Sequence, residues 1–396
     1  MPAPIHTSRM GRRRPSDPRH ARKEARNPMP ISNRISVWTC IIMLLLSSGG
    51  VANILVPPFI FSRSGSDSWV AILLALPPML LWCGLLCYVI RKLNGVPIEQ
   101  WLSDRFGRAA SWTMRALVVV LLLLQASTLS WETAHIAIHS YMSHTPVWII
   151  AGATAALCAW TASGGLRSIA YACVILVPIA VILDSLLLML NWPNMDSRML
   201  LPILENGISP ALKGMPLAAA AMLEIWLVLF VQQHVKGRFR WYQFALLVLF
   251  LCWLQLIPVV VSICVFGSDQ AFKLRSPVLE IWKVISLGPT IEHIDLFAIV
   301  QRVSSTFARI SLLFYLSARL GPVRGRRGLT IFFVGMAAVV TAFSSSKVTD
   351  SELFFFLIEY QYPVFIAFVP ALTALLAILL RWRSPLPTAG KEAEPG

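Results

Sequence analysis

Charged residues are scarce in this chain, and acidic residues are the scarcest of them. Only 13% of the 396 residues are Asp, Glu, Lys or Arg, and 19 are acidic against 34 basic. The acids stand singly rather than in pairs at catalytic spacing. A glycine-rich phosphate loop, a nucleophile elbow and a zinc-protease motif are also lacking. We therefore predict that the protein is not an enzyme.

The seven cysteines do not indicate a metal site. All of them lie within or at the edges of apolar runs, and none is spaced from a histidine as in a zinc finger. We interpret them as small core residues, and no metal or other cofactor is predicted.

Long apolar runs dominate what is present. Hydrophobic residues make up 57% of the chain, in runs near the roughly 20 residues that a bilayer span requires. The net charge of +15 does not indicate nucleic-acid binding, because Lys and Arg lie between the apolar runs. We predict an all-α integral membrane protein whose partner is the lipid bilayer, with ten spans at about 37–60, 68–90, 112–131, 146–163, 169–190, 214–232, 241–264, 293–317, 329–346 and 354–380.

The two ends of the chain differ from this apolar body. Residues 1–34 carry nine Lys or Arg and several prolines, which predicts a disordered tail, although Met29 is an alternative start. The membrane domain is predicted over 35–382, followed by a short Pro-rich tail at 383–396. If the basic tail is cytoplasmic, inner connections carry 12 Lys or Arg and outer ones 7, and an even number of spans places both termini inside.

One acid, Glu224, stands inside the predicted sixth span. A carboxylate at membrane depth costs about 2.5–3.5 kcal/mol on insertion scales, so it tends to face a ligand, a cavity or a basic partner. Asp184 lies in the fifth span, and Arg302 and Arg309 lie seven residues apart in the eighth. We predict an ion pair between Asp184 or Glu224 and one of these arginines.

The first and sixth spans contain helix-breaking residues. Ser47-Ser48-Gly49-Gly50 interrupts the first, and Gly214, Pro216 and Ala218–Ala221 open the sixth. Breaks in corresponding spans of two five-span halves are typical of a transporter site near the midplane. Close helix packing through small residues is the alternative interpretation.

Two further segments have two interpretations each. Glu132, His135 and His139 follow metal-like spacing on one helix face, but solvated outer histidines are the preferred interpretation. The segment Ser276–Thr290 has the pattern of a short amphipathic helix on the outer face, either a lid or a plain interfacial helix.

Several stretches resemble a known family. They are L-L-P-I-L-E-N-G-I-S-P-A-L-K-G at 200–214, S-P-V-L-E-I-W-K-V-I-S-L-G at 276–288, I-E-H-I-D at 291–295, A-R-I-S-L-L-F-Y at 308–315 and T-P-V-W at 145–148. They resemble the B-subunit permeases of bacterial spore germinant receptors (GerAB type), within the amino acid/polyamine/organocation transporter superfamily. The resemblance covers about 34–382.

The resemblance implies a fold, a function and partners. It implies a LeuT-like 5+5 inverted repeat of ten transmembrane helices with broken helices 1 and 6. It also implies that a small nutrient, usually an amino acid, binds in the spore inner membrane, and that an A-type and a lipoprotein C-type subunit complete the receptor. The family has Phe-Gly before the acid of span 6, whereas this chain has Met222-Leu223. Unwinding is therefore expected at Gly214, Pro216 or the alanine cluster.

The candidate ligand site combines both lines of reasoning. A substrate carboxylate is expected at backbone N–H groups of Ser48–Gly50, the unwound part of span 1, and its ammonium at carbonyls or Glu224. Ser304–Thr306 could ligate sodium, but we favour a fixed charge from Arg309, which would repel it. The candidate ligand-binding residues are Ser47, Ser48, Gly49, Gly50, Gln125, Ala219, Glu224, Ser305 and Thr306, and the candidate structural or coupling charges are Glu132, Asp184, Arg302 and Arg309.

Three functions fit this reading. The preferred one is a receptor subunit that senses a nutrient and triggers germination. The alternatives are an ordinary amino acid permease of the same superfamily and a scaffolding subunit that has lost its ligand. Fold alone does not separate them.

Overall fold

The computed structural model describes residues 34–205, 207–285, 295–323 and 325–382. The chain divides into two units, Met1–Arg34 and Ile35–Gly396, and the described helices and strands all belong to the second. The two predicted tails lie outside the described residues, apart from Arg34.

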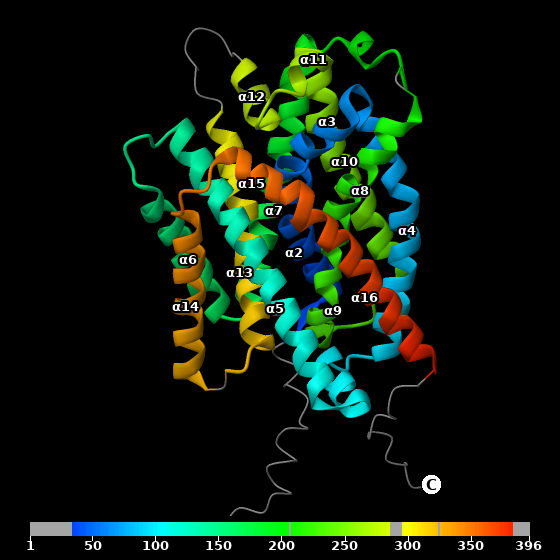
Figure 1. Ribbon diagram of the computed structural model, residues 1–396, viewed down its shortest axis with the longest axis vertical. Helices are drawn as coiled ribbons and strands as arrows, with labels where there is room; N and C mark the ends of the chain where they lie inside the picture. The colour runs from blue at the N-terminus through cyan, green and yellow to red at the C-terminus, as the bar shows by residue number, and fades with distance from the viewer. Residues whose placement is uncertain (1–33, 206, 286–294, 324, 383–396) are drawn as a thin grey trace, which may run out of the picture. The chain divides into compact units, whose positions relative to one another are not determined.

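The first half of the membrane unit is a succession of helices joined by short connections (Figure 1). Its elements are β1 (Ile35–Ser36), α2 (Val37–Gly50), η2 (Val51–Leu55), α3 (Pro57–Ser64), η3 (Gly65–Asp67), α4 (Ser68–Leu93), α5 (Ile98–Ser140), α6 (Val147–Ser163), α7 (Leu166–Asn191), η4 (Trp192–Asn194) and η5 (Ser197–Leu200).

The second half is also mostly helical. Its elements are α8 (Ile208–Leu223), η6 (Glu224–Leu227), α9 (Val228–Val231), η7 (Gln232–His234), β2 (Val235–Lys236), α10 (Trp241–Phe266), α11 (Ser268–Ala271), α12 (Pro277–Val284), α13 (Leu296–Leu320), α14 (Arg326–Ser344), α15 (Asp350–Phe356), η8 (Leu357–Gln361) and α16 (Tyr362–Trp382).

Within the described ranges, nine helical segments are long and apolar enough to cross a membrane. The predicted fourth span corresponds to a shorter apolar helix, Val147–Ser163. The span that contains α7 exposes Ile175, Ile179 and Ile182, although it is among the most apolar. Exposed apolar side chains on such a helix suit contact with lipid rather than water. The all-α membrane fold is thus confirmed.

The first span changes its winding at η2, a π-helical segment, where Val56 N–H donates to Val51 O. Pro57 follows directly, and its ring would clash with the carbonyl four residues earlier in a regular helix. Ser47–Gly50 remain α-helical, so the prediction that they form the unwound part was wrong. Their small size serves packing instead, because a Cβ on Gly50 would lie 2.1 Å from Ser305 Oγ on α13.

The sixth span changes its winding later than predicted. Helix α8 continues through Gly214, Pro216 and Ala218–Ala221 and becomes the 3₁₀ segment η6 at Glu224 itself. Placing the break at Gly214, Pro216 or the alanines was therefore wrong. Gly214 instead allows α3 to approach, since a Cβ there would lie 1.8 Å from Ser64 Oγ.

Short parallel strands tie the two interrupted spans together. Ile35 of β1 pairs with Val235 of β2, and Ser36 pairs with Lys236. The start of the first span is thereby joined to the end of the sixth.

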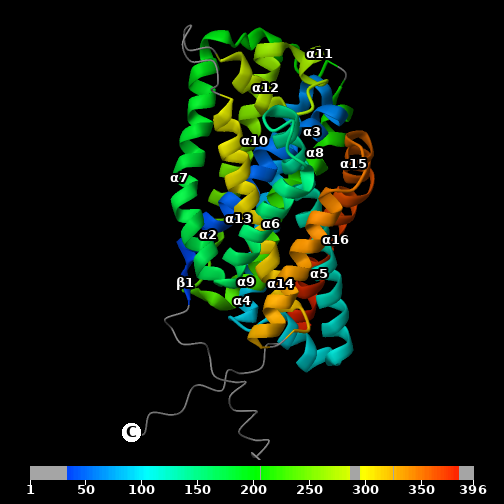
Figure 2. The same ribbon diagram turned by 90° about the vertical axis from the view of Figure 1, so that its left-hand side faces the viewer.

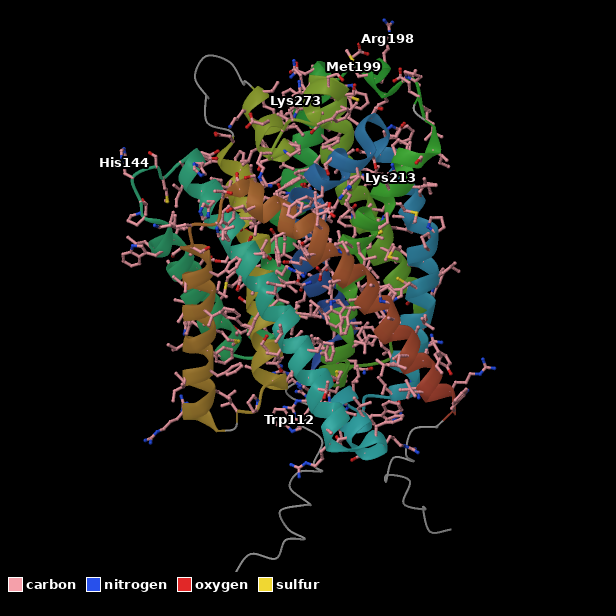
Figure 3. The ribbon with its side chains drawn as sticks, viewed as in Figure 1. Trp112, His144, Arg198, Met199, Lys213 and Lys273 are labelled. Carbon is pink, nitrogen blue, oxygen red and sulfur yellow. The ribbon has the colours of Figure 1, made fainter. Side chains whose placement is uncertain are left out.

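The opposite end of the unit carries α11 and α12, beside α3 (Figure 1). Lys273, between these two helices, lies at this end with Arg198, whereas Trp112 lies at the other (Figure 3). Helix α12 buries Val278, Ile281 and Trp282 in a cluster with residues of α7, α10 and α13. A short amphipathic helix therefore exists within the predicted segment, whose residues 286–290 lie outside the described ranges.

The close approach at Gly50 gives a first prediction. Gly50→Ala is expected to cost about 1–3 kcal/mol of unfolding free energy, the usual penalty of overpacking. Adding Ser305→Gly should recover most of this, because the nearest remaining atom of residue 305 would be its Cα at 3.6 Å. The control is Gly335→Ala in α14, where a Cβ meets nothing within 4 Å. Denaturation of the purified protein in detergent measures all of them, and equal losses in Gly50→Ala and Gly335→Ala would contradict the packing argument.

Candidate functional site

The predicted ligand-binding residues converge from α2, α5, η6 and α13. One cavity, the inner cavity, is lined by Ser47, Gly50, Val51, Ile54, Leu55, Leu129, Arg302, Ser305, Thr306 and Arg309. A second, which shares Val51, Leu55, Leu129 and Arg309, adds Gln125, Thr128, Glu224, Gln361, Tyr362 and Phe365. Gly49 lines a third cavity beside α7, whereas Ser48 and Ala219 are buried without lining any of the three.

Arg309 and Glu224 form the central ion pair, with an Arg309 Nη2 to Glu224 Oε2 distance of 2.5 Å. Gln125 lies between them: it accepts a 3.1 Å hydrogen bond from Arg309 Nη2 and donates one of 3.3 Å to Glu224 Oε1. Arg309 Nη1 also donates to Ser47 O at 3.5 Å. Because both charged side chains are buried, the pair holds α2, α5, η6 and α13 together through bonds that are costly to break.

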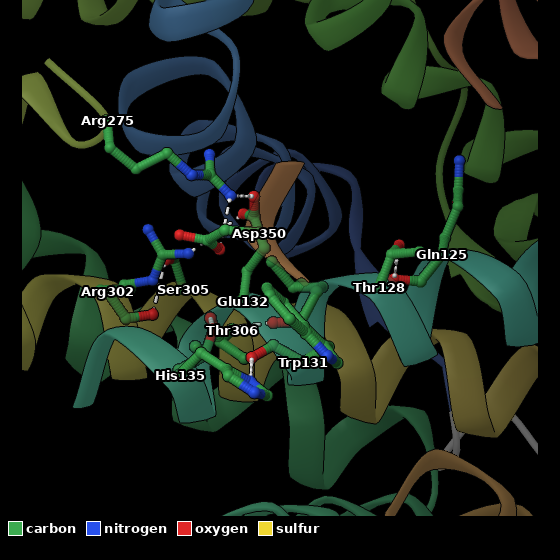
Figure 4. Close-up of polar contacts among 12 residues, drawn as sticks. Gln125, Thr128, Trp131, Glu132, His135, Arg275, Arg302, Ser305, Thr306 and Asp350 are labelled. Carbon is green, nitrogen blue, oxygen red and sulfur yellow. Dashed lines mark hydrogen bonds and ion pairs between the residues drawn. The ribbon is translucent and has the colours of Figure 1, made fainter. Parts of the chain in front are cut away.

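A second ion network links the core to the outer segment, which is the connection 272–276 between α11 and α12 (Figure 4). Glu132 on α5 pairs with Arg302 on α13 and with Arg275, both at 3.2 Å, and Arg275 also pairs with Asp350 at 3.3 Å. Burial lowers the pKa of the Arg275 guanidinium, but the carboxylates of Glu132 and Asp350 outweigh that effect and hold this pKa above its ordinary value. Arg275 therefore stays charged and fixes the segment between α11 and α12 to the core.

A wide outer pocket of about 780 Å³ lies on the far side of this network. Arg275 and Asp350 line it, together with Pro58, Ser62, Arg63, Phe272, Lys273, Leu274, Ser351, Phe354, Phe355, Ile358 and Glu359. Arg302 lines the inner cavity, so the ion network Arg275–Glu132–Arg302 extends from the outer pocket to the inner cavity.

The hydroxyls proposed as alternative sodium ligands have other partners. Ser305 donates to Arg302 O at 2.9 Å, and Thr306 shares a 3.0 Å hydrogen bond with Thr133 on α5. Arg309 lines the same cavity, and its charge is balanced by Glu224.

Among the residues that the structure describes, Asp184 pairs with no arginine, unlike Glu224. Its Oδ1 accepts hydrogen bonds from Asn53 Nδ2 at 2.5 Å and from Gln301 Nε2 at 2.6 Å. The predicted ion pair between Asp184 or Glu224 and one of these arginines therefore forms at Glu224, with Arg309, while Arg302 pairs with Glu132.

The metal-like spacing at Glu132 does not build a metal site in the part of the chain that the structure describes. No group of three His, Cys, Asp or Glu side chains there could hold a metal ion. Glu132 turns toward its two arginines, while the His135 ring stacks on Trp131 with the centroids 3.7 Å apart.

Sequence reasoning missed several residues of the site. Arg275 lies in the connection between α11 and α12, where no sequence pattern marked it, and Asn53 and Gln301 are uncharged. Gln361 and Tyr362 had a signal: the polar run E-Y-Q interrupts the tenth apolar stretch and coincides with the π-helical segment η8. Such segments are frequent at functional sites.

Known proteins resemble this chain over most of its length. A family model described as spore germination protein matches residues 34–345. Spore germination protein XB of Bacillus anthracis is 25% identical over 325 residues, which is 82% of this chain and 91% of the relative. Spore germination protein KB of Bacillus subtilis (strain 168) is 22% identical over 292 residues, or 71% of this chain and 76% of that protein.

A solved structure shares the fold. The crystal structure of MhsT in complex with L-phenylalanine superposes with a TM-score of 0.63 and 13% identity, covering 88% of this chain and 99% of MhsT. This likeness confirms the LeuT-like all-α architecture. The family consists of permeases rather than enzymes, as predicted. Because its model spans most of the sequence, this chain belongs to the family of spore germination permeases.

Proposed function

We propose that this protein is the B-type subunit of a nutrient germinant receptor and binds the carboxylate of an amino acid between α2 and α13. It would act in the spore inner membrane with both termini cytoplasmic, beside A-type and C-type subunits. Membership of the spore germination family supports the receptor role.

The observation that carries the ligand assignment is a pair of unsatisfied donors in one cavity. Ser47 Oγ and Arg302 Nε are buried and have no hydrogen-bond partner among the described residues, and both side chains line the inner cavity. A buried donor without a partner costs about 1–3 kcal/mol. Two such donors that share one small space suit an anionic acceptor, and a carboxylate can accept from both.

The position differs from the one predicted at the backbone of Ser48–Gly50. Those residues are α-helical, so the broken-helix N–H groups that the prediction required do not exist there. Side-chain donors replace them in this proposal. Because Arg309 neutralises Glu224, we expect the ammonium group of the nutrient to donate hydrogen bonds to carbonyl oxygens instead.

The size of the cavity supports a coupled conformational change. Its volume of about 10 Å³ has room for one water-sized group, so an amino acid fits only if α2 and α13 separate. A nutrient arriving through the 780 Å³ outer pocket would first meet Arg275 and Asp350. Displacement of the Arg275–Glu132–Arg302 network would then move the outer segment, which is the signal we propose that the partner subunits receive.

Two serines of α2 provide the test. We expect deletion of the gene in its spore-forming host to abolish germination on one nutrient of a panel of amino acids, sugars and nucleosides. Restoring the gene with Ser47→Ala should raise the concentration for half-maximal germination about tenfold or more, the effect of losing one hydrogen bond to a charged group. Ser48→Ala is the matched control, because its hydroxyl is also buried and unpartnered but lines none of the three cavities.

Other results would redirect the proposal. Equal shifts in the two serine variants would contradict a carboxylate at Ser47. Normal germination with altered amino acid uptake in the deletion strain would make the protein an ordinary amino acid permease.

A further inference from the structure

Asp184 differs from the other membrane-embedded acids in its surroundings. Asp184 is only 3% exposed, and Glu132 and Glu224 are buried to a similar degree. Unlike those two acids, Asp184 has no Lys or Arg of the described residues within 4 Å of its carboxylate. Its hydrogen bonds come from two neutral amides instead, Asn53 on η2 and Gln301 on α13. A buried carboxylate with neutral donors alone keeps an uncompensated charge when it is ionised.

The same two amides leave oxygen atoms without partners. Both side chains turn their nitrogens toward Asp184 Oδ1, and Asn53 Oδ1 and Gln301 Oε1 are then buried without a hydrogen-bond donor among the described residues. Asp184 Oδ2 accepts no hydrogen bond from them either, since both amides donate to Oδ1. The cluster therefore has an excess of acceptors, which only a cation or further donors can satisfy.

A cavity adjoins this cluster. It has a volume of about 30 Å³ and is lined by Asp184, Gln301, Ser305, Gly49 and Gly50, with apolar residues of α2, α7 and α10 around them. Figure 2 shows α2, α7 and α13, which surround it, packed side by side. A volume of this size holds about two water-sized groups, which suits a metal ion with one water but not a bulky organic cation.

We propose that Asp184, Asn53 and Gln301 bind a monovalent alkali cation, Na⁺ or K⁺, between α2–η2, α7 and α13. Carboxylate and amide oxygens are the ligands that hard cations take in proteins. A monovalent ion neutralises the single carboxylate, whereas a divalent ion would bring a net positive charge into the membrane.

The nearby arginines do not oppose this site. Arg302 and Arg309 also lie on α13, but Glu132 and Glu224 respectively neutralise them. The site is also distinct from the Ser304–Thr306 position considered from the sequence, because its ligands lie on η2, on α7 and one turn earlier on α13. The proposed ion would brace η2, the π-helical segment at which the first span changes its winding.

Thermal unfolding of the purified full chain in detergent tests the proposal without any nutrient. Choline chloride is replaced stepwise by NaCl or KCl at constant ionic strength. We expect a saturable rise in Tm with at least one of the two salts, because an ion that binds only the folded chain stabilises it by mass action. Asp184→Asn should abolish this rise, and the exposed control Asp196→Asn should keep it.

A second variant covers the case in which Asp184→Asn does not fold. Gln301→Leu keeps the carboxylate and removes one ligand, and should raise the half-saturating cation concentration about tenfold. Equal Tm values in choline, Na⁺ and K⁺ for the unmodified chain would overturn the proposal, as would a full cation response in Gln301→Leu. Stabilisation by methylammonium but by neither metal ion would also overturn it. None of these results bears on the nutrient carboxylate at Ser47, which has its own test.

Discussion

Replacing Arg309 by leucine is expected to destabilise the protein by about 3–5 kcal/mol, whereas replacing Glu224 and Arg309 together by leucine should cost far less. The single change leaves the buried Glu224 carboxylate without a counter-charge, and removal of one partner of a buried ion pair typically costs that much. The double change removes both charges, and an apolar pair of similar volume is often neutral or even stabilising.

Chemical denaturation in detergent, read as the free energy of unfolding, measures this cycle. Arg63→Leu is a suitable control, because Arg63 and its partner Glu359 are both more than 40% exposed, and such surface pairs contribute about 0–1 kcal/mol. The double variant Asp184→Leu/Arg309→Leu distinguishes the alternative pairing. Rescue by the Asp184 change rather than by the Glu224 change would show that Arg309 acts through Asp184.

The fold could be predicted from the sequence to a large extent, because lipid imposes a simple rule on apolar runs. The predicted eighth span, at about 293–317, is helix α13 with a shift of three residues at each end. The winding changes were harder to place. Gly49 and Gly50 suggested a break at the wrong position, because in this chain they serve close packing. The winding instead changes at η2, directly before Pro57 and Pro58.

The members of the candidate site were easier to predict than their partners. Glu224, Arg302 and Arg309 stood out because a charge at membrane depth is rare and costly. Glu132 stood out for another reason, its metal-like spacing from His135 and His139. Which acid meets which arginine depends on the rotation and height of each helix, and a sequence pattern fixes these only to within a turn. Asn53 and Gln301 were missed as partners of Asp184 since neutral amides cost less to bury and therefore stand out less.

Glu132→Gln is expected to cost about 3–5 kcal/mol as well, and to loosen the outer segment. Glutamine keeps the shape of the side chain but removes the negative charge that Arg302 and Arg275 share. Arg302 is buried and would be left without a counter-charge, a situation that proteins tolerate poorly. Asp350→Asn is the matched control, because Asp350 also pairs with Arg275 at almost the same distance but its side chain is 54% exposed. Its loss should cost no more than about 1 kcal/mol.

This network could act as a structural brace alone or also as a barrier between the outer pocket and the inner cavity. The two roles predict different results for Glu132→Gln. A brace alone predicts lower stability with an unchanged path to the cavity. A barrier also predicts that a thiol placed in the cavity, Ser47→Cys, reacts faster with a water-soluble reagent when Glu132→Gln is present, under conditions where the protein stays folded. The seven native cysteines are all buried, so labelling at them reports unfolding within the same sample. Faster labelling at position 47, with no labelling of the native cysteines, would show that Glu132 limits access to the cavity. Unchanged labelling beside a large loss of stability would reduce the network to a brace and leave the outer pocket without a route through it.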